Sequence, residues 1–280
     1  DLSNLHAAVK FYNKTLAKGI KPILGSTIRL NDASHRATLL AMTKKGWRGL
    51  TEIVSRGYIE GQQLSIPCVQ KEWVLEQSQD LIVLLGLHSD VGEMLVSAYP
   101  EKAEPLLEQW IEKFGNRVYL ALTRTQRPME EDFIQEAVKL AAKYNIGVVA
   151  LNDVHFIRAE DYEAHEARVC IADGYVLGDS KRPKNYTPEQ YFKSSAEMIE
   201  LFSDIPSAIE NTIQIAKRCT VSLRLGFNDL PDYPIPEGHT IETYFEHLSE
   251  VGLEERLDVL YPLEKRDEDW AKIRQPYDER

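Results

Sequence analysis

The sequence has no excess of basic residues, no long apolar run and no closely spaced cysteines. Lys and Arg total 33 against 44 Asp and Glu, a formal net charge of -11, so no domain-wide basic field is present to hold a nucleic-acid backbone. No apolar run approaches the roughly 20 residues that span a bilayer, and the N-terminus does not resemble a signal peptide. Cys68, Cys170 and Cys219 form no CxxC pair, which is typical of a reducing compartment. We therefore expect a cytoplasmic protein without membrane contact.

The length of 280 residues allows one large α/β domain or one domain with an appendage. The first residues, DLSNL, begin without methionine, as if in the middle of an element. We interpret the chain as a fragment of a longer protein.

Short apolar runs alternate with amphipathic stretches in the first half of the chain. The runs at 81–85, 118–122 and 147–151 are bounded by turn formers and are too short for buried helices, which favours strands. The stretch after the second run repeats apolar residues at helical spacing, with Phe133 and Ala137 in one row. Strands that alternate with helices predict a parallel sheet. Because each intervening segment is long enough for a crossover, we predict that these three strands are adjacent and parallel.

The alternation stops after Phe156. Helical patterns at 158–175, 194–202 and 205–219 are separated by polar loops. In the last of them Ile205, Ile209 and Ile213 recur every four residues, which predicts a core-facing row. From residue 227 the segment FNDLPDYPIPEGH concentrates Pro, Gly and Asp, which is typical of a linker, and two strongly charged helical stretches follow.

Polar residues follow each buried strand. His88 follows the first run, Thr125 the second, and Asp153 and His155 the third, in LNDVHF. The loops at the C-terminal ends of parallel strands converge to make sites in α/β folds. If the backbone is still extended, Asp153 and His155 at i and i+2 face one spot, a geometry suited to metal binding or proton transfer. The alternative is that Asp153 caps the next helix or turn and His155 is an ordinary loop histidine.

Several long motifs, in order, resemble one family: GIKPILG, LNDVHF, DGYVLGDSKRPKNYTPEQY, MIELFSDIPSAIENTIQIAKRC, GLEERL and PYDER. They resemble the N-terminal part of bacterial DNA polymerase III alpha subunits, over essentially the whole chain. That part of the family is a PHP (polymerase and histidinol phosphatase) domain. The resemblance implies an α/β fold, a distorted (β/α)7 barrel of PHP type with a C-terminal helical extension. It implies a PHP domain at 1–226 that lacks its first strand and motif, and a linker with the first helices towards the polymerase palm at 227–280.

The resemblance also implies a metal site of which only part remains. PHP domains hold up to three metal ions at the strands' C-terminal ends, and the matching positions that keep a ligand type are Asp1, His35, Asp153 and His155. His88, offset by one position, is a candidate partial substitute.

Four matching positions have lost the family's ligand: Leu2 and Thr125 stand where the family has His, Thr27 where it has Glu, and Leu87 where it has Cys. A zinc-type ion needs three or four donor atoms, so we expect no bound metal. Zinc or manganese would be expected only if the site still binds metal.

The function implied by the resemblance is that of a DNA-directed DNA polymerase, a nucleotidyltransferase of DNA replication that uses magnesium. The family's catalytic carboxylates lie beyond Arg280, so we expect this chain to be an inactive, largely non-catalytic PHP scaffold. Its expected partners are the proofreading 3'-5' exonuclease subunit and other holoenzyme subunits, and DNA mainly through parts of the parent outside this chain. Candidate contact surfaces are the 180–186 loop and the faces near Trp73 and Trp110. The alternative is a metal-dependent phosphoesterase, in which clustered ions activate water.

Overall fold

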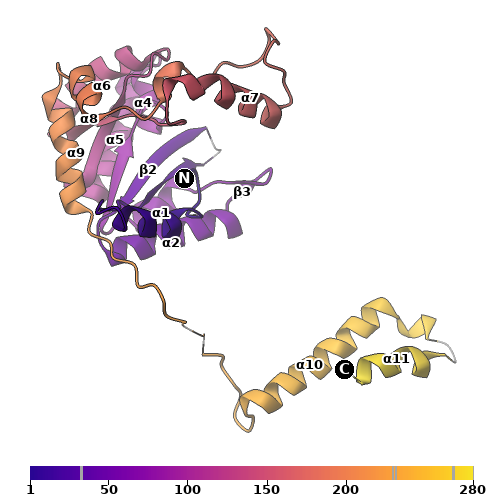
Figure 1. Ribbon diagram of the computed structural model, residues 1–280. Coiled ribbons are helices and arrows are strands. Elements are labelled where there is room, and N and C mark those ends of the chain that lie inside the picture. Colours follow the sequence, from indigo (N-terminus) through magenta and orange to yellow (C-terminus); the bar gives the residue numbers. More distant parts are fainter. Residues whose placement is uncertain (32–33, 229, 231, 267–268, 280) are drawn as a thin grey trace. The chain divides into compact units, whose positions relative to one another are not determined.

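The computed structural model describes residues 1–280 except 32, 33, 229, 231, 267, 268 and 280. The chain forms two compact units, Asp1–Leu223 and Arg224–Arg280 (Figure 1). The division into two units says where the chain separates and not which family each unit belongs to. The assignment of 1–226 to a PHP domain and of 227–280 to a linker and polymerase helices therefore remains a prediction.

A mixed five-stranded sheet with the order β1-β2-β5-β6-β7 forms the centre of the first unit. β6 lies parallel to both β5 and β7, so the prediction of three adjacent parallel strands is confirmed. β2 pairs antiparallel with both β1 and β5. The strands are β1 (Gly25–Leu30), β2 (His35–Ala41), β5 (Leu81–Leu85), β6 (Val118–Thr123) and β7 (Gly147–Leu151), beside a separate ribbon of β3 (Gln62–Gln63) and β4 (Ile66–Pro67).

The sheet is open in the part of the chain that the structure describes, and the expected closed barrel of seven strands is not seen there. β1 and β7 are its two ends, and isolated parallel bridges pair Leu2 with Thr27 and Val69 with Leu30 on β1. Two features account for this arrangement. β1 and β2 form a hairpin rather than a helix-connected parallel pair, and after Leu151 the chain forms helices instead of another strand along β7.

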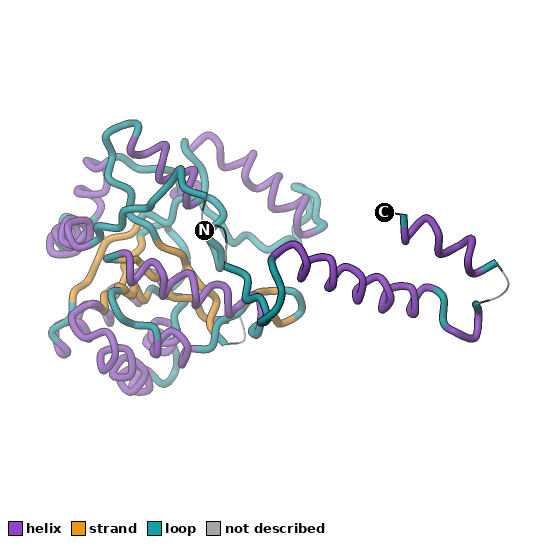
Figure 2. The backbone as a smooth tube through the Cα atoms, turned by 90° about the horizontal axis from the view of Figure 1, so that it is seen from below, coloured by secondary structure: helices purple, strands orange, loops and turns teal. Residues whose placement is uncertain are grey.

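Helices pack against the sheet (Figures 1 and 2). The buried side chains between them form two hydrophobic cores. The larger core contains Leu50, Trp110 and Phe133, all fully buried, from α2, α5 and α6. The smaller core joins Tyr119 on β6 to Ile215 on α9. The helices of this unit are α1 (Ala8–Leu16), α2 (Lys44–Ile59), α3 (Lys71–Glu76), α4 (Asp90–Leu95), α5 (Ala103–Phe114), α6 (Glu130–Tyr144), α7 (Tyr162–Asp173), α8 (Ser195–Leu201) and α9 (Pro206–Arg218).

The predicted core-facing rows have different outcomes. Phe133 and Ala137 are buried in α6, as predicted. Ile213 in α9 is 56% exposed, so the prediction that it lies in a core-facing row is wrong. The buried residues of α9 are Ala208 and Ile215. α9 packs mainly on the edge strand β7, so only a narrow side of the helix is covered.

In its described residues the second unit contains two α-helices, α10 (Ile241–Leu260) and α11 (Trp270–Asp278). Thr240 caps α10, since its hydroxyl accepts the backbone N–H of Thr243, and an ion pair between Arg274 and Glu254 links the two helices. Among the described residues, no helix of either unit is long and apolar enough to cross a membrane.

Candidate functional site at the strand ends

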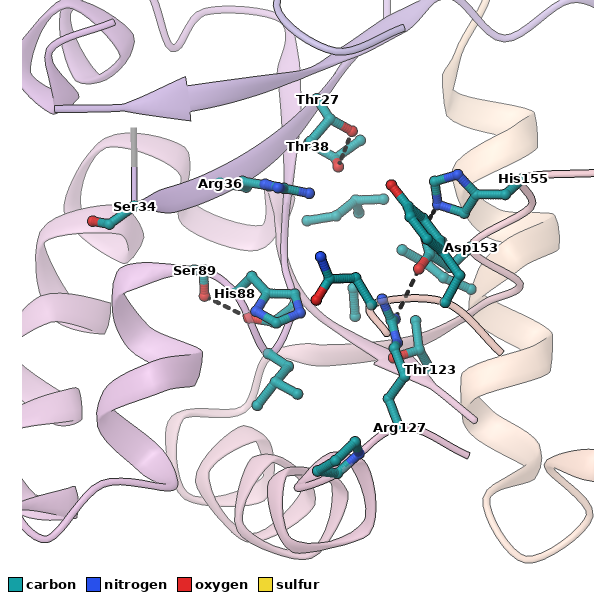
Figure 3. Close-up of a pocket in the computed structure, with 18 of the residues that line it drawn as sticks. Thr27, Ser34, Arg36, Thr38, His88, Ser89, Thr123, Arg127, Asp153 and His155 are labelled. Atoms are coloured by element: carbon teal, nitrogen blue, oxygen red, sulfur yellow. Dashed lines mark hydrogen bonds and ion pairs between the residues drawn. The ribbon is translucent and has the colours of Figure 1, made fainter. Parts of the chain in front are cut away.

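A cavity of about 680 Å³ opens at the C-terminal ends of the parallel strands (Figure 3). Its wall contains residues from the loops that follow β5, β6 and β7, from the adjacent face of β1 and β2, and from 184–186. Of the polar side chains predicted to converge at this edge of the sheet, His88, Asp153 and His155 line the cavity.

Asp153 and His155 both line the cavity, and the Asp153 Oδ1 and His155 Nε2 atoms lie 3.6 Å apart. The predicted reason for their proximity is wrong, because β7 ends at Leu151 and the backbone of Asp153 is left-handed, with φ of 44°. A left-handed non-glycine residue costs free energy and persists only where its surroundings hold it. The left-handed backbone of Asp153 after the strand end, and not an extended strand, brings the two side chains together.

Side chains hold the Asp153 carboxylate. Arg127 Nη2 lies 2.8 Å from Asp153 Oδ2, and the amide of the fully buried Gln190 donates to the same oxygen at 3.0 Å. The backbone carbonyl of Gln190 in turn accepts the backbone N–H of His155 at 2.9 Å. Burial acts to raise the pKa of Asp153, but the His155 hydrogen bond, the Arg127 charge and Gln190 together lower this pKa to about 2. Asp153 is therefore an ionised link between loops, bound by side chains rather than acting as a helix cap.

Arg127 also connects Asp153 to a second, more deeply buried carboxylate. The Glu130 side chain is 3% exposed and lies 3.2 Å from Arg127 Nη2. Glu130 accepts the backbone N–H of Thr125 at 2.6 Å and the hydroxyls of Thr125 and Thr123 at 2.7 and 3.0 Å. Arg127 therefore joins the start of α6 to the loop after β7.

Sequence reasoning missed both Arg127 and Glu130. The sequence did contain a signal for this pair. Arg127 follows a buried strand and precedes by three positions Glu130, an acid in the first turn of a helix, and this spacing favours an ion pair.

The remaining candidate ligands are divided between the cavity and other places. His88 lines the cavity, and burial, followed by the charges of Arg127 and Arg36, lowers its pKa below 6.5. His35 is not among the lining residues, and its Nε2 lies 3.3 Å from Glu93. Asp1 uses its carboxylate to accept the backbone N–H of residue 7 at 3.1 Å, before α1. The structure thus brings His88 to Asp153 and His155, and leaves His35 and Asp1 apart.

The positions with replaced ligands form ordinary structural contacts. Thr27 and Thr38 share a hydroxyl hydrogen bond of 2.9 Å across the β1–β2 pair, and both line the cavity. Leu87, 9% exposed, also lines it. Thr125 is 1% exposed and bonded to Glu130, and Leu2 forms the bridge to β1. None of these four side chains is now a strong metal ligand.

The donor set does not fit a resident metal ion. Within residues 1–280, leaving out the seven undescribed positions, no group of three or more His, Cys, Asp or Glu side chains is arranged to hold one. The Arg127 guanidinium, 2.8 Å from Asp153, also places a positive charge against the carboxylate that a cation would need.

Comparison with known proteins gives a match to one family model and matches to longer proteins. The family model of the PHP domain matches residues 1–125. Along its whole length the chain is 46% identical to DNA polymerase III subunit alpha of Pseudomonas fluorescens and 42% identical to that of Escherichia coli strain K12. It covers 24% of each of these proteins, so it spans about a quarter of the length of the curated relatives it matches.

Proposed function

We propose a function from the premise that the chain contains a PHP domain and is homologous along its whole length to the N-terminal region of DNA polymerase III subunit alpha. The proposal is that it forms part of a DNA-directed DNA polymerase, a nucleotidyltransferase of DNA replication in the bacterial cytoplasm. The observation that carries it is the 46% identity over 286 aligned residues, which leaves no part of the chain unmatched.

Within that polymerase, the proposed role of this portion is a non-catalytic scaffold that docks the proofreading 3'-5' exonuclease and contacts other holoenzyme subunits. The bonds of Asp153 to Arg127 and Gln190 support this role, because they use the carboxylate for linking loops. Of the candidate contact surfaces, Trp110 is fully buried and is excluded, whereas Trp73 is half-buried with the Arg56 guanidinium 4.1 Å from its ring centre.

The finer assignments belong to the same proposal. Residues 1–226 form the PHP domain, a variant of the barrel type, and 227–280 form the linker and first helices towards the palm. Magnesium and most of the DNA would be bound by parts of the polymerase outside this chain.

Two measurements test the proposal. The chain of 280 residues should extend no primer, because two-metal nucleotidyl transfer needs carboxylates that the proposal places elsewhere. The same preparation should bind the purified exonuclease subunit in surface plasmon resonance. Primer extension above buffer would refute the non-catalytic role, and absence of exonuclease binding would refute the docking role.

A metal-dependent phosphoesterase is the second candidate function. The observation in its favour is that Asp153, His155 and His88 line one cavity at the strand ends. Hydrolysis of a phosphate monoester that requires zinc or manganese and is abolished by Asp153→Asn would establish it. The scaffold proposal predicts no metal-dependent turnover.

A further inference from the structure

We propose that the edge of the sheet opposite the strand-end cavity is a contact surface for the backbone of a single-stranded nucleic acid. This goes beyond the proposed scaffold function and depends neither on exonuclease docking nor on a metal ion.

The position of this edge follows from the directions of the strands. Ala41, the last residue of β2, pairs with Leu81, the first residue of β5, and β1 begins beside the end of β2. The starts of β1, β5, β6 and β7 therefore lie together, away from the strand ends that form the cavity. We call this side of the sheet the basic edge, after six cations in the segments that adjoin it: Lys21, Lys44, Lys45, Arg117, Lys217 and Arg218.

Hydrogen bonds bring the first group of these cations together. Lys21 Nζ donates to the carbonyl of Ala216, in the last turn of α9, at 2.6 Å. Arg218 Nη1 donates to the carbonyl of Asn116, the residue before Arg117, at 3.0 Å. Burial is the main cause of a lowered pKa at Arg117, and the nearby charge of Arg218 also lowers this pKa. Cations from three distant segments of the chain therefore lie close to one another.

The start of α2 adds Lys44 and Lys45 to the same edge. The backbone N–H of Thr220 donates to the carbonyl of Met42 at 2.7 Å, which places the segment after α9 beside the residues that precede α2. The macrodipole of α9 favours the basic residues in its last turn. The macrodipole of α2 opposes cations at its N-terminal end, and its first turn reads KKGW, without an acid. Helix stability therefore does not account for these two lysines.

The positive charges of the basic edge are not neutralised by ion pairs. None of the six cations has an ion-pair partner in the part of the chain that the structure describes. Arg117 and Arg218 donate to backbone carbonyls, which fixes their positions and leaves their charges in place. The charge of Asp80 raises the pKa of Arg117 and so offsets part of this field. The side chains that are exposed to a ligand include Lys44, Lys45 and Lys217. Such a local group of cations attracts a polyanion even though the whole chain is acidic.

An open hollow beside the two lysines of α2 provides room for a base. Its volume is about 880 Å³, and its wall contains the half-buried ring of Trp47 together with Lys44 and Lys45. An aromatic ring next to cations that track a phosphate backbone is the arrangement by which proteins bind single strands, because any base can stack on such a ring. A duplex keeps its bases paired and stacked inside, so the hollow favours a single strand.

The spread of the cations favours a nucleic acid over an acidic peptide. The six side chains come from four segments along the edge of the sheet. A nucleic-acid strand carries one phosphate per nucleotide and can follow such a row, whereas a peptide would need its carboxylates spaced to match. Lysine and arginine without carboxylate partners are also the residues that contact phosphate oxygens in nucleic-acid complexes.

The test is fluorescence anisotropy of a labelled oligothymidylate of about 15 nucleotides, titrated with the chain in buffer that contains EDTA. For six phosphate contacts, the logarithm of the affinity should fall with the logarithm of the salt concentration with a slope of about -4. The triple variant Lys44→Gln/Lys45→Gln/Lys217→Gln should reduce this slope to about -2 and weaken binding at least about tenfold at low salt.

A matched control removes three exposed cations from outside the basic edge: Lys102→Gln/Lys139→Gln/Lys181→Gln. It has the same net charge as the first variant and should bind like the parent, because the cations are removed elsewhere. Melting temperatures equal to that of the parent show that both variants fold. A duplex of the same length and poly-glutamate are titrated as competitors.

Binding of the single strand that is weakened by the first variant and not by the control supports the proposal. No binding by the parent, or equal losses in the two variants, would overturn it. Stronger competition by the duplex would overturn the single-strand assignment, and stronger competition by poly-glutamate would show that the edge is a site for an acidic protein segment instead.

Discussion

Replacing Arg127 tests whether a side-chain cation holds the strand-end loops together. The change Arg127→Met keeps most of the aliphatic length and removes the guanidinium that lies 2.8 Å from Asp153 and 3.2 Å from Glu130. Breaking a buried ion pair by removing one partner costs about 3–5 kcal/mol, because the other charge stays buried.

Two features of the structure make the expected decrease in the free energy of unfolding smaller than this range of about 3–5 kcal/mol. Glu130 keeps the hydrogen bonds from Thr123 and Thr125, and the Asp153 side chain is 34% exposed, so water can solvate it. We therefore expect Arg127→Met to cost about 2–3 kcal/mol. For a unit of this size, that loss corresponds to a fall in melting temperature of roughly 5–8 °C.

The assay is urea denaturation followed by circular dichroism, with a double-mutant cycle of Arg127→Met and Glu130→Gln. We expect a coupling free energy above about 1 kcal/mol, since the two side chains are in contact. The control Arg48→Met breaks an exposed pair with Glu52 and should cost less than about 0.5 kcal/mol. A loss for Arg127→Met no larger than that of the control would refute the reasoning.

Three further outcomes are expected from the same network. Asp153→Asn should cost only about 1–2 kcal/mol in urea denaturation, because it keeps the shape and one carbonyl acceptor; a larger loss would contradict this. The pKa of Asp153 is lowered from 3.8 to about 2, so the ionised carboxylate should stabilise the folded state fully above pH 4, and this contribution to the free energy of unfolding should disappear as the pH falls to about 2. In acid titration the Asp153→Asn variant should not show this part of the decrease in stability. Gln190→Leu should lower the free energy of unfolding by about 2 kcal/mol. The side-chain carbonyl of Gln190 accepts the backbone N–H of Thr187 at 3.0 Å, and the variant leaves this N–H without a partner. A near-neutral result would show that water replaces the lost acceptor.

The parallel part of the sheet was predictable because local pattern determines it. Runs such as 81–85 and 147–151 are apolar throughout and too short for helices, and helical segments separate them. The open end beside β7 was not predictable, because the absence of a further strand there among the described residues depends on contacts between distant segments. The β1–β2 hairpin pairs strands that are neighbours in sequence, so a local pattern could have indicated it. The PHP resemblance predicted a closed barrel, which describes the family's arrangement rather than the pairing in this sheet.

The candidate site was predictable in part for a similar reason. Asp153 and His155 do lie close together, yet the backbone of Asp153 is left-handed and not extended. Their side-chain partners, such as Gln190, come from distant sequence. For His35 a local signal existed. His35 lies on the same face of β2 as Leu39, a fully buried residue of the larger core, whereas Arg36 lies on the opposite face and lines the cavity. The alternation of side chains along the strand therefore indicates that His35 is directed away from the cavity.

The most direct test of the account is the metal content and chelator response of the purified chain. If Arg127 occupies the place of a cation, elemental analysis should find zinc and manganese far below one ion per chain, and EDTA should leave the melting temperature unchanged. If the site binds metal, chelation should instead lower the free energy of unfolding of the protein by about 2.7 kcal/mol, for a metal concentration one hundred times its Kd. Stoichiometric metal, together with a melting temperature that falls in EDTA and recovers with zinc or manganese, would contradict the account.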